Sequence, residues 1–165
     1  MGGERALELA RRLGERLRQR GETLAVAESC TGGLLADRIT DVPGASDYFL
    51  LGVVAYANRA KEALLGVPAA VLERHGAVSG ETARAMAEGV RRRAGSDWGL
   101  ATTGIAGPGG ARPGKPVGLV WVATAGSGEV WAEELHLAGD RRQVKEGAVE
   151  ALLEAFLRTL EGGWG

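Results

Sequence analysis

The sequence has little of what proteins use to bind metals or to cross-link themselves. Its 165 residues include a single cysteine, Cys30, and only two histidines, His75 and His136. One cysteine excludes an intrachain disulfide and a cysteine-rich zinc site. The two histidines lie far apart in the sequence and lack the spacing of metal ligands. The sequence therefore predicts no metal site.

An excess of charge of one sign and long apolar runs are also absent. The chain has 20 Lys and Arg against 21 Asp and Glu, a formal net charge of −1, which argues against nucleic acid as a partner. The arginine runs at 11–12 and 91–93 lie among Glu and Ala and are typical of solvated helix faces. No apolar run is long enough to span a membrane, and the N-terminus is charged and amphipathic rather than signal-like. We expect a cytoplasmic protein with no membrane or nucleic-acid partner.

The hydrophobic pattern predicts one domain over residues 1–165, with alternating helices and strands. A turn at 126–128 between two strands indicates an antiparallel hairpin. We expect an α/β fold with helices on both faces of a mixed sheet, and helix caps at Asn58, Ser79 and Asp140. Helices are predicted over 4–20, 34–39, 58–65, 68–74, from 80 onward and from 141 onward, and strands over 23–27, 48–56, 98–103, 117–125 and 130–137.

The most informative stretch is 23–35, where an apolar strand is followed by Glu-Ser-Cys-Thr-Gly-Gly and then a helix. Such a turn directs unpaired backbone amides and the positive end of the helix dipole at one point. Ser29 in that turn can act as a nucleophile, with neighbouring amides holding an oxyanion. The alternative is that Ser29 or Thr31 only caps the helix.

Polar side chains also follow the next two strands. The second strand ends at Tyr56 with Lys61 just beyond, and the third ends at Thr103 before a glycine-rich loop. Open α/β sheets bind ligands at the carboxyl ends of their strands. If these ends cluster, Ser29, Tyr56, Lys61 and Thr103 face one cavity.

Serine, lysine and tyrosine form a workable acyl-transfer set without histidine. Lys61 can remove the serine proton only if burial or a nearby cation lowers its pKa. The alternatives are that Lys61 is an exposed lysine at a helix start and that Tyr56 simply packs. Cys30 is a second candidate nucleophile, but neither histidine has an obvious path to it.

Arg141 and Arg142 lie in the first turn of the last predicted helix. A cation there is mildly unfavourable against the helix dipole unless an anion is bound. One of them is therefore a candidate phosphate or carboxylate clamp, the alternative being that both are solvated.

Several stretches together resemble the CinA C-terminal domain family, in the order that they have in that family. The family includes the bacterial nicotinamide mononucleotide deamidases. The motifs are AESCTGG at 27–33, YANRAK at 56–61, HGAVS at 75–79, GIAGP at 104–108, KPVG at 115–118 and GDR at 139–141.

The resemblance implies a three-layer α/β/α sandwich, a homodimer, and hydrolysis of nicotinamide mononucleotide to nicotinic acid mononucleotide and ammonia. It implies no metal and no cofactor. Ser29 would be the nucleophile, Lys61 its base, Tyr56 and Thr103 assisting groups, and Arg141 the partner of the substrate phosphate. The remaining substrate contacts expected are Cys30, Thr31, Gly32, Gly33, Gly104 and Gly107.

Two features depart from the family pattern. Pro108 runs directly into Gly109 and Gly110, where many relatives carry an intervening polar residue. Longer CinA proteins also carry an N-terminal nucleotide-pyrophosphatase-like domain, which we do not expect in this chain. The alternative to an enzyme is a nucleotide-binding or interaction module that uses the same pocket without turnover, related to competence or damage-inducible proteins.

Overall fold

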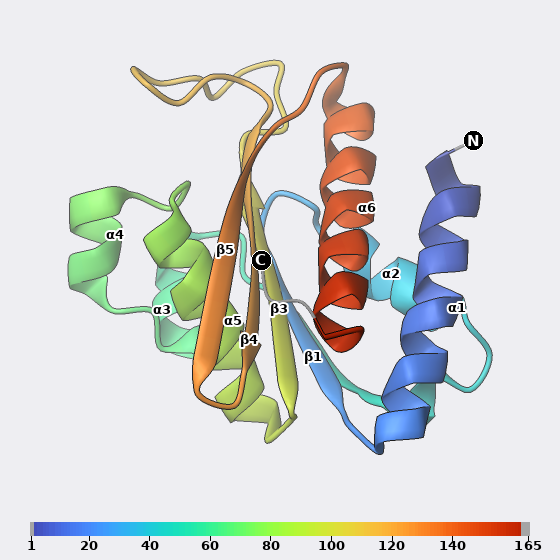
Figure 1. The fold of residues 1–165 in the computed structure, drawn as a ribbon. Coiled ribbons are helices and arrows are strands. Elements are labelled where there is room, and N and C mark those ends of the chain that lie inside the picture. The colour runs from blue at the N-terminus through green and yellow to red at the C-terminus, as the bar shows by residue number, and fades with distance from the viewer. Residues whose placement is uncertain (1, 163–165) are drawn as a thin grey trace.

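The computed structural model describes residues 2–162, and residues 1 and 163–165 of the predicted domain lie outside that part. Every predicted helix and strand is found, with one short 3₁₀ helix in addition (Figure 1). The elements are α1 (Gly2–Arg20), β1 (Leu24–Glu28), α2 (Leu34–Thr40), η1 (Ala45–Asp47), β2 (Phe49–Val54), α3 (Asn58–Leu65), α4 (Ala69–His75), α5 (Gly80–Ala94), β3 (Trp98–Gly104), β4 (Leu119–Gly126), β5 (Glu129–His136) and α6 (Arg141–Leu160).

The strands form one sheet in the order β2-β1-β3-β4-β5. β1 pairs in parallel with β2 and with β3, whereas β3–β4 and β4–β5 are antiparallel. This confirms the mixed sheet and the hairpin at its end. In the centre of the sheet, Ala27 lies between Val53 of β2 and Ala101 of β3.

Helices cover both faces of the sheet, which confirms the three-layer α/β/α sandwich (Figure 1). Alternate side chains of β1 point to opposite faces, as in any strand. Leu24 and Val26 join the core formed with α1, α2 and α6, and Ala25 and Ala27 join the core formed with α3, α4 and α5. All four side chains are at most 1% exposed, so β1 is buried on both faces.

Glycines bring α5 close to α3 on one side and to the sheet on the other. A Cβ on Gly89 of α5 would lie 1.9 Å from the carbonyl oxygen of Leu65 in α3, and a Cβ on Gly99 of β3 would lie 2.2 Å from that of Ala87. Both distances are far inside van der Waals contact, so these helices approach only because the side chains are missing. This packing fixes α3, which carries Lys61, against the centre of the molecule.

The order of the strands creates a crevice at the carboxyl end of β1. The chain leaves β1 towards α2 on one face of the sheet, and it leaves β2 towards α3 on the other face. Chains that diverge in this way leave a ligand-sized gap outside the strand ends. Ser29, Tyr56 and Gly104 lie at or just after the ends of β1, β2 and β3.

Two local predictions were wrong. The strand predicted over 48–56 is shorter, because Tyr48 packs into the core near α1 and the chain turns away after Val54. Asn58 is not a cap but the first residue of α3, and the extended residue Ala57 precedes it. The other two caps are confirmed: Ser79 accepts from the amide of Thr82, and Asp140 forms a capping box with Gln143.

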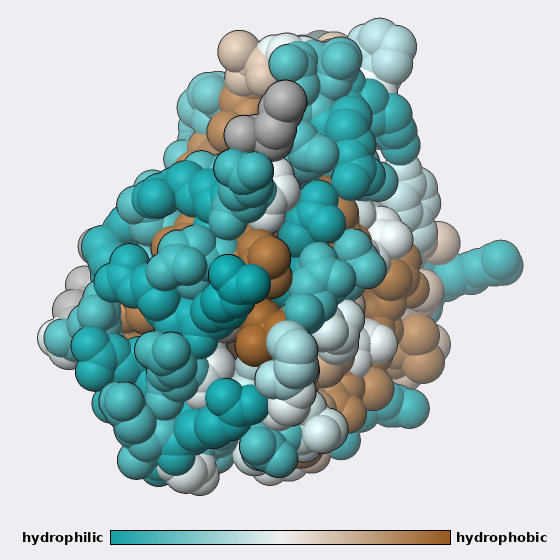
Figure 2. Space-filling model, turned by 90° about the vertical axis from the view of Figure 1, so that its right-hand side faces the viewer, coloured by the Kyte–Doolittle hydropathy of each residue, from teal (hydrophilic) through white to brown (hydrophobic). Residues whose placement is uncertain are grey.

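The surface on the side of α1 is mainly hydrophilic, and apolar side chains show there only in patches (Figure 2). The apolar stripe of α1 expected from the sequence, Ala6, Leu9, Leu13 and Leu17, is turned inward and at most 3% exposed. Within residues 2–162, no helix has the length and apolar character that crossing a bilayer requires.

Candidate active site

The turn after β1 is held by a buried carboxylate that the sequence analysis did not single out. Glu28 is 1% exposed, and its Oε1 and Oε2 accept from the amides of Leu35 and Ala36 at 2.8 and 3.0 Å. These amides belong to the first turn of α2 and would otherwise be unsatisfied. The capping residue of α2, Gly33, has no side chain for this task, so Glu28 takes it over from the end of β1. The signal that could have revealed it is an acidic residue at a strand end with a Gly-Gly pair beginning four residues later, just before the helix.

Thr31 ties this turn to β3. Its hydroxyl donates to Glu28 Oε1 at 2.5 Å and lies 2.7 Å from the hydroxyl of Thr102. Because Thr31 has one hydrogen to give, Thr102 is the donor in the second bond. Thr31 as a whole residue is 0% exposed, so its role here is to hold the turn, and the substrate contact expected of it is not found.

Ser29 and Lys61 meet beneath this turn. The Nζ of Lys61 lies 3.0 Å from Ser29 Oγ, 3.0 Å from the carbonyl oxygen of Ala55 and 2.8 Å from that of Tyr56. A neutral amine has two N–H donors and one lone pair. The ammonium form of Lys61 donates to all three oxygens, whereas in the neutral form the two carbonyls take both donors and the lone pair is left for the hydroxyl proton of Ser29.

The surroundings of Lys61 favour the neutral amine. The residue is 1% exposed, and burial lowers the pKa of its amine from the ordinary lysine value. Its position in the first turn of α3 acts in the same direction, because a helix N-terminus disfavours a cation. A thiolate at Cys30 would oppose the shift, but burial raises the pKa of Cys30 to about 12, so the thiol is neutral near pH 7.

The same high pKa argues against Cys30 as the nucleophile. The thiol packs in the core shared with α1, α2 and α6 and is 6% exposed. His75 and His136 are paired elsewhere, with Glu81 and Glu134. Cys30 can therefore meet a ligand only through its backbone.

The backbone of the turn offers amides for an oxyanion, but not all those expected. Gly32 donates to the carbonyl oxygen of Ser29 at 3.1 Å and is not free. The amides of Cys30, Thr31 and Gly33 have no acceptor in another described residue. Lys145 of α6, which the sequence analysis missed, brings its Nζ to 3.7 Å from the place of a Cβ on Gly32. The turn is therefore a positively polarised concavity suited to negative charge.

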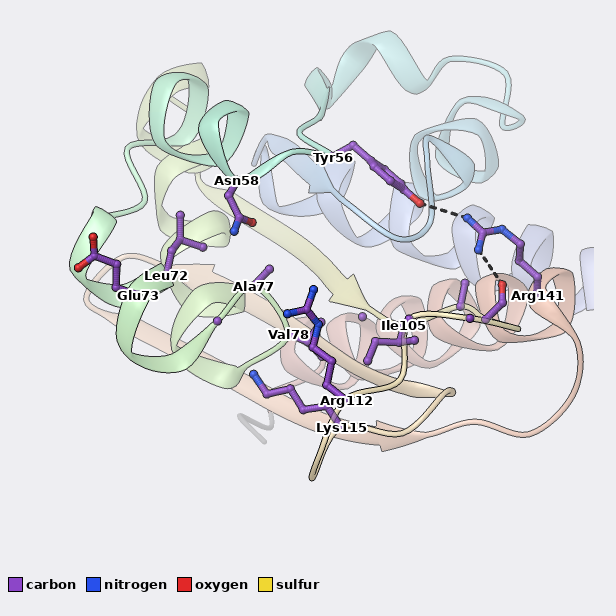
Figure 3. Close-up of a pocket in the computed structure, with 16 residues that line it drawn as sticks. Tyr56, Asn58, Leu72, Glu73, Ala77, Val78, Ile105, Arg112, Lys115 and Arg141 are labelled. Atoms are coloured by element: carbon purple, nitrogen blue, oxygen red, sulfur yellow. Dashed lines mark hydrogen bonds between the residues drawn. The ribbon is translucent and has the colours of Figure 1, made fainter.

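Tyr56 lies differently from its predicted role as a partner of Lys61. Only its carbonyl contacts Lys61, because the ring turns outward and the residue is 60% exposed. Its hydroxyl accepts from Nη2 of Arg141 at 3.1 Å, and Nη1 of Arg141 donates to the carbonyl oxygen of Gly107 at 2.7 Å (Figure 3). This Tyr56–Arg141–Gly107 bridge links the segment after β2 to α6 and to the glycine-rich loop.

Thr103 also differs from its predicted assisting role. Its hydroxyl donates to the carbonyl oxygen of Ala77 at 2.8 Å and is not hydrogen-bonded to Ser29 or Lys61. The residue is 1% exposed. Its contact fixes the segment between α4 and α5 against β3, which shapes the cavity beside the serine.

A cavity of about 620 Å³ opens next to the Ser29–Lys61 pair. Tyr56, Gly104, Gly107 and Arg141 line it, and of the four strand-end side chains expected to share a cavity only Tyr56 is among its lining residues. The pair adjoins the cavity through Tyr56, whose carbonyl oxygen accepts from Lys61, and Ser29 is 8% exposed. The other lining residues are Asn58, Leu72, Glu73, Gly76, Ala77, Val78, Ile105, Ala106, Gly109, Gly110, Arg112 and Lys115.

The lining of the cavity also distinguishes between the two candidate arginines of α6, Arg141 and Arg142. Arg141 lines the cavity, while Arg142 is exposed and donates to Glu146 at 2.9 Å. Over residues 2–162, no group of three or more His, Cys, Asp or Glu side chains is arranged to hold a metal. The chemistry available to the described residues is that of a hydroxyl, a buried amine, backbone amides and guanidinium groups.

Solved structures with this fold are similar along nearly the whole chain. Competence damage-inducible protein A of Klebsiella pneumoniae superposes with a TM-score of 0.93 at 35% identity, covering 95% of this chain and 98% of that one. Competence/damage inducible protein CihA of Agrobacterium tumefaciens superposes with a TM-score of 0.91 at 40% identity, covering 95% and 96%.

Sequence comparison leads to the same group of proteins. A CinA-like protein of Anaeromyxobacter sp. (strain Fw109-5) is 58% identical over 151 residues, which is 91% of this chain and 37% of that protein. The chain spans about a third of the length of the curated relatives it matches. The model of the CinA C-terminal domain matches residues 6–160. The chain therefore belongs to the CinA C-terminal domain family.

Proposed function

We propose that this chain is an amidohydrolase that converts nicotinamide mononucleotide to nicotinic acid mononucleotide and ammonia. The observation that supports this most is the 3.0 Å contact between Ser29 Oγ and the buried amine of Lys61. A serine beside an amine of lowered pKa, under a turn with free amides, is the arrangement that acyl transfer needs. The choice of substrate rests on the resemblance to a family that includes deamidases of this nucleotide.

In the proposed first half-reaction, Lys61 takes the proton of Ser29 and Oγ forms a bond to the carboxamide carbon. The carbonyl oxygen becomes an oxyanion, which the free amide of Gly33 can receive. The protonated Lys61 then gives its proton to the amide nitrogen. The carbon–nitrogen bond breaks, ammonia leaves and an ester remains on Ser29.

In the second half-reaction, Lys61 takes a proton from water and the hydroxide attacks the ester carbon. The ester bond breaks, and Oγ of Ser29 recovers its proton from Lys61 as the acid departs. Each proton that Lys61 accepts is returned, so the enzyme ends in its starting state. The cavity beside the pair would hold the ribose phosphate, with Arg141 at its edge.

The test is direct. The purified chain is incubated with nicotinamide mononucleotide, and ammonia and nicotinic acid mononucleotide are measured together. We expect both products in equal amounts, and we expect Cys30→Ala to retain turnover because the thiol is buried and protonated. An inactive wild-type chain across the pH range from 6 to 10 would contradict the proposal.

One observation favours a second candidate, a binding module without turnover. The cavity is lined by Tyr56 and Gly104 but not by Ser29 or Lys61, so a ligand can fill it without reaching the serine. The relatives named as competence-damage inducible proteins fit such a role. Calorimetry that detects nucleotide binding while no ammonia is released selects this candidate over the enzyme.

A further inference from the structure

The glycine-rich loop ends in a tight turn that places two cations side by side. The turn is Arg112-Pro113-Gly114-Lys115, in which Gly114 has a φ of 75° and Pro113 precedes it, the pattern of a type II turn. Arg112 and Lys115 exchange two backbone hydrogen bonds, of 2.9 and 2.8 Å, and form an antiparallel bridge. Residues opposite each other in such a bridge project from the same face. Both side chains therefore point the same way, into the cavity.

Only one of these two cations is held by the protein. The ammonium of Lys115 donates to the carbonyl oxygen of His75 at 2.7 Å, which anchors the turn to the end of α4. The guanidinium of Arg112 has no hydrogen-bond or ion-pair partner in the described part of the chain. Figure 3 shows it extending from the loop into the cavity, between Lys115 and Asn58.

The balance of charge around the cavity is uneven. Its lining includes the cations Arg112, Lys115 and Arg141 but a single acidic residue, Glu73, which points away from Arg112 in Figure 3. Like charges directly opposite each other across a bridge are destabilising on their own. Concave surfaces lined by one sign of charge also concentrate ligands of the other sign. Both effects indicate that this end of the cavity is built for an anion.

Arg141 is less free to meet that anion. Two of its N–H groups are already given to Gly107 and Tyr56, and they hold the glycine-rich loop in place. Arg112 has all five of its donors available, in a fork that fits phosphate, and Lys115 adds a second positive charge beside it. A phosphate monoester carries close to two negative charges near pH 7 and so matches this pair better than a carboxylate does.

We propose that Arg112 and Lys115 form an anion subsite that takes the phosphate monoester of a mononucleotide, at the end of the cavity away from the Tyr56–Arg141–Gly107 bridge. The subsite makes Arg112 the residue that distinguishes a nucleotide from its nucleoside. The inference rests on the proposed function for the identity of the nucleotide, but the binding of the phosphate group does not depend on turnover.

Calorimetry with ligands that lack the carboxamide separates the two questions. Nicotinic acid mononucleotide and nicotinic acid riboside differ only in the phosphate and cannot be deamidated. They are titrated into the wild-type chain, Arg112→Gln, and the control Arg93→Gln, which removes the same charge from an exposed position on α5. Circular dichroism verifies that each variant is folded.

We expect the wild-type chain and Arg93→Gln to bind the mononucleotide more tightly than the riboside. Arg112→Gln should lose about tenfold or more in affinity for the mononucleotide and nothing for the riboside. Equal mononucleotide affinity in Arg112→Gln and Arg93→Gln would overturn the subsite, as would equal losses for both ligands or no preference for phosphate in the wild-type chain. If phosphate is distinguished but nicotinamide mononucleotide yields no ammonia, the subsite stands and the proposed hydrolysis fails.

Discussion

Lys61 is the residue on which the proposed chemistry depends. Its amine is buried and contacts two carbonyl acceptors and Ser29, and no carboxylate within residues 2–162 is bonded to it. A buried ammonium is costly unless it is paired with a charge, so the neutral form gains relative to water. The fold thus lowers the pKa of the base by burying the amine away from water and from negative charges.

This environment predicts how activity depends on pH. Because burial lowers the pKa of Lys61, kcat/KM should rise with pH and then reach a plateau. The midpoint of the rise should lie below the ordinary lysine pKa of about 10.4. The measurement is the rate of ammonia release from nicotinamide mononucleotide across pH 6 to 10. A flat profile throughout that range would contradict the role of Lys61 as the base.

The lowered pKa of Lys61 should also make the stability of the folded chain depend on pH. The unfolded chain binds a proton at position 61 up to the ordinary lysine pKa, whereas the folded chain releases it at lower pH, so the unfolded state holds more protons between the two values. The free energy of unfolding therefore rises with pH across that window. In Lys61→Met this contribution to the rise should be missing, which urea titrations of both proteins at several pH values can detect.

Tyr56 provides a second prediction for a single residue. Its carbonyl holds Lys61, but its hydroxyl contacts Arg141, so Tyr56→Phe should leave the base in place and weaken only the bridge. Loss of one such hydrogen bond predicts a decrease in kcat/KM of about tenfold or less. A proton relay through the hydroxyl predicts a far larger decrease in kcat, and that result would restore the catalytic role expected from the sequence.

At the scale of elements, the decisive feature is the link between β1 and α2. The buried Glu28 accepts from two amides of α2 and from Thr31, and Thr102 connects the same group to β3. Ser29 lies between the anchored residues 28 and 31, so its position depends on this network. Glu28 touches no reacting atom and acts as a positioning residue.

Glu28→Gln tests that link. The NH₂ group of glutamine must face either the amide of Ala36 or the amide of Leu35 together with the Thr31 hydroxyl, and in both places an acceptor is needed. We expect a loss of about 2–3 kcal/mol in the free energy of unfolding, because a charge-assisted bond is lost inside the protein. The control Glu15→Gln, on the exposed face of α1, should change it by less than about 0.5 kcal/mol. Urea unfolding of both variants measures the difference, and equal stabilities would show that Glu28 does not hold the turn.

At the scale of the whole molecule, the sequence pattern predicted the features that depend on residues close together in the chain. Periodicity located the elements, and Ser79 and Asp140 were recognisable caps because their partners lie three residues away. Glu28 was missed because its partners lie seven and eight residues further on, across a turn. The outward turn of Tyr56 was equally out of reach, since it depends on Arg141, 85 residues away. The cavity lining needs the packing of distant loops and could not be predicted from spacing.

The central claim is that Ser29 and Lys61 act as one catalytic unit, and a double-mutant cycle tests it most directly. The measurement is kcat/KM for ammonia release from nicotinamide mononucleotide by the wild-type chain, Ser29→Ala, Lys61→Met and the double variant. Each single change should lower it at least about 10³-fold, and the double variant should be no worse than either one, because residues that act together are not additive. Full turnover by Ser29→Ala, or single effects that multiply in the double variant, would contradict the account.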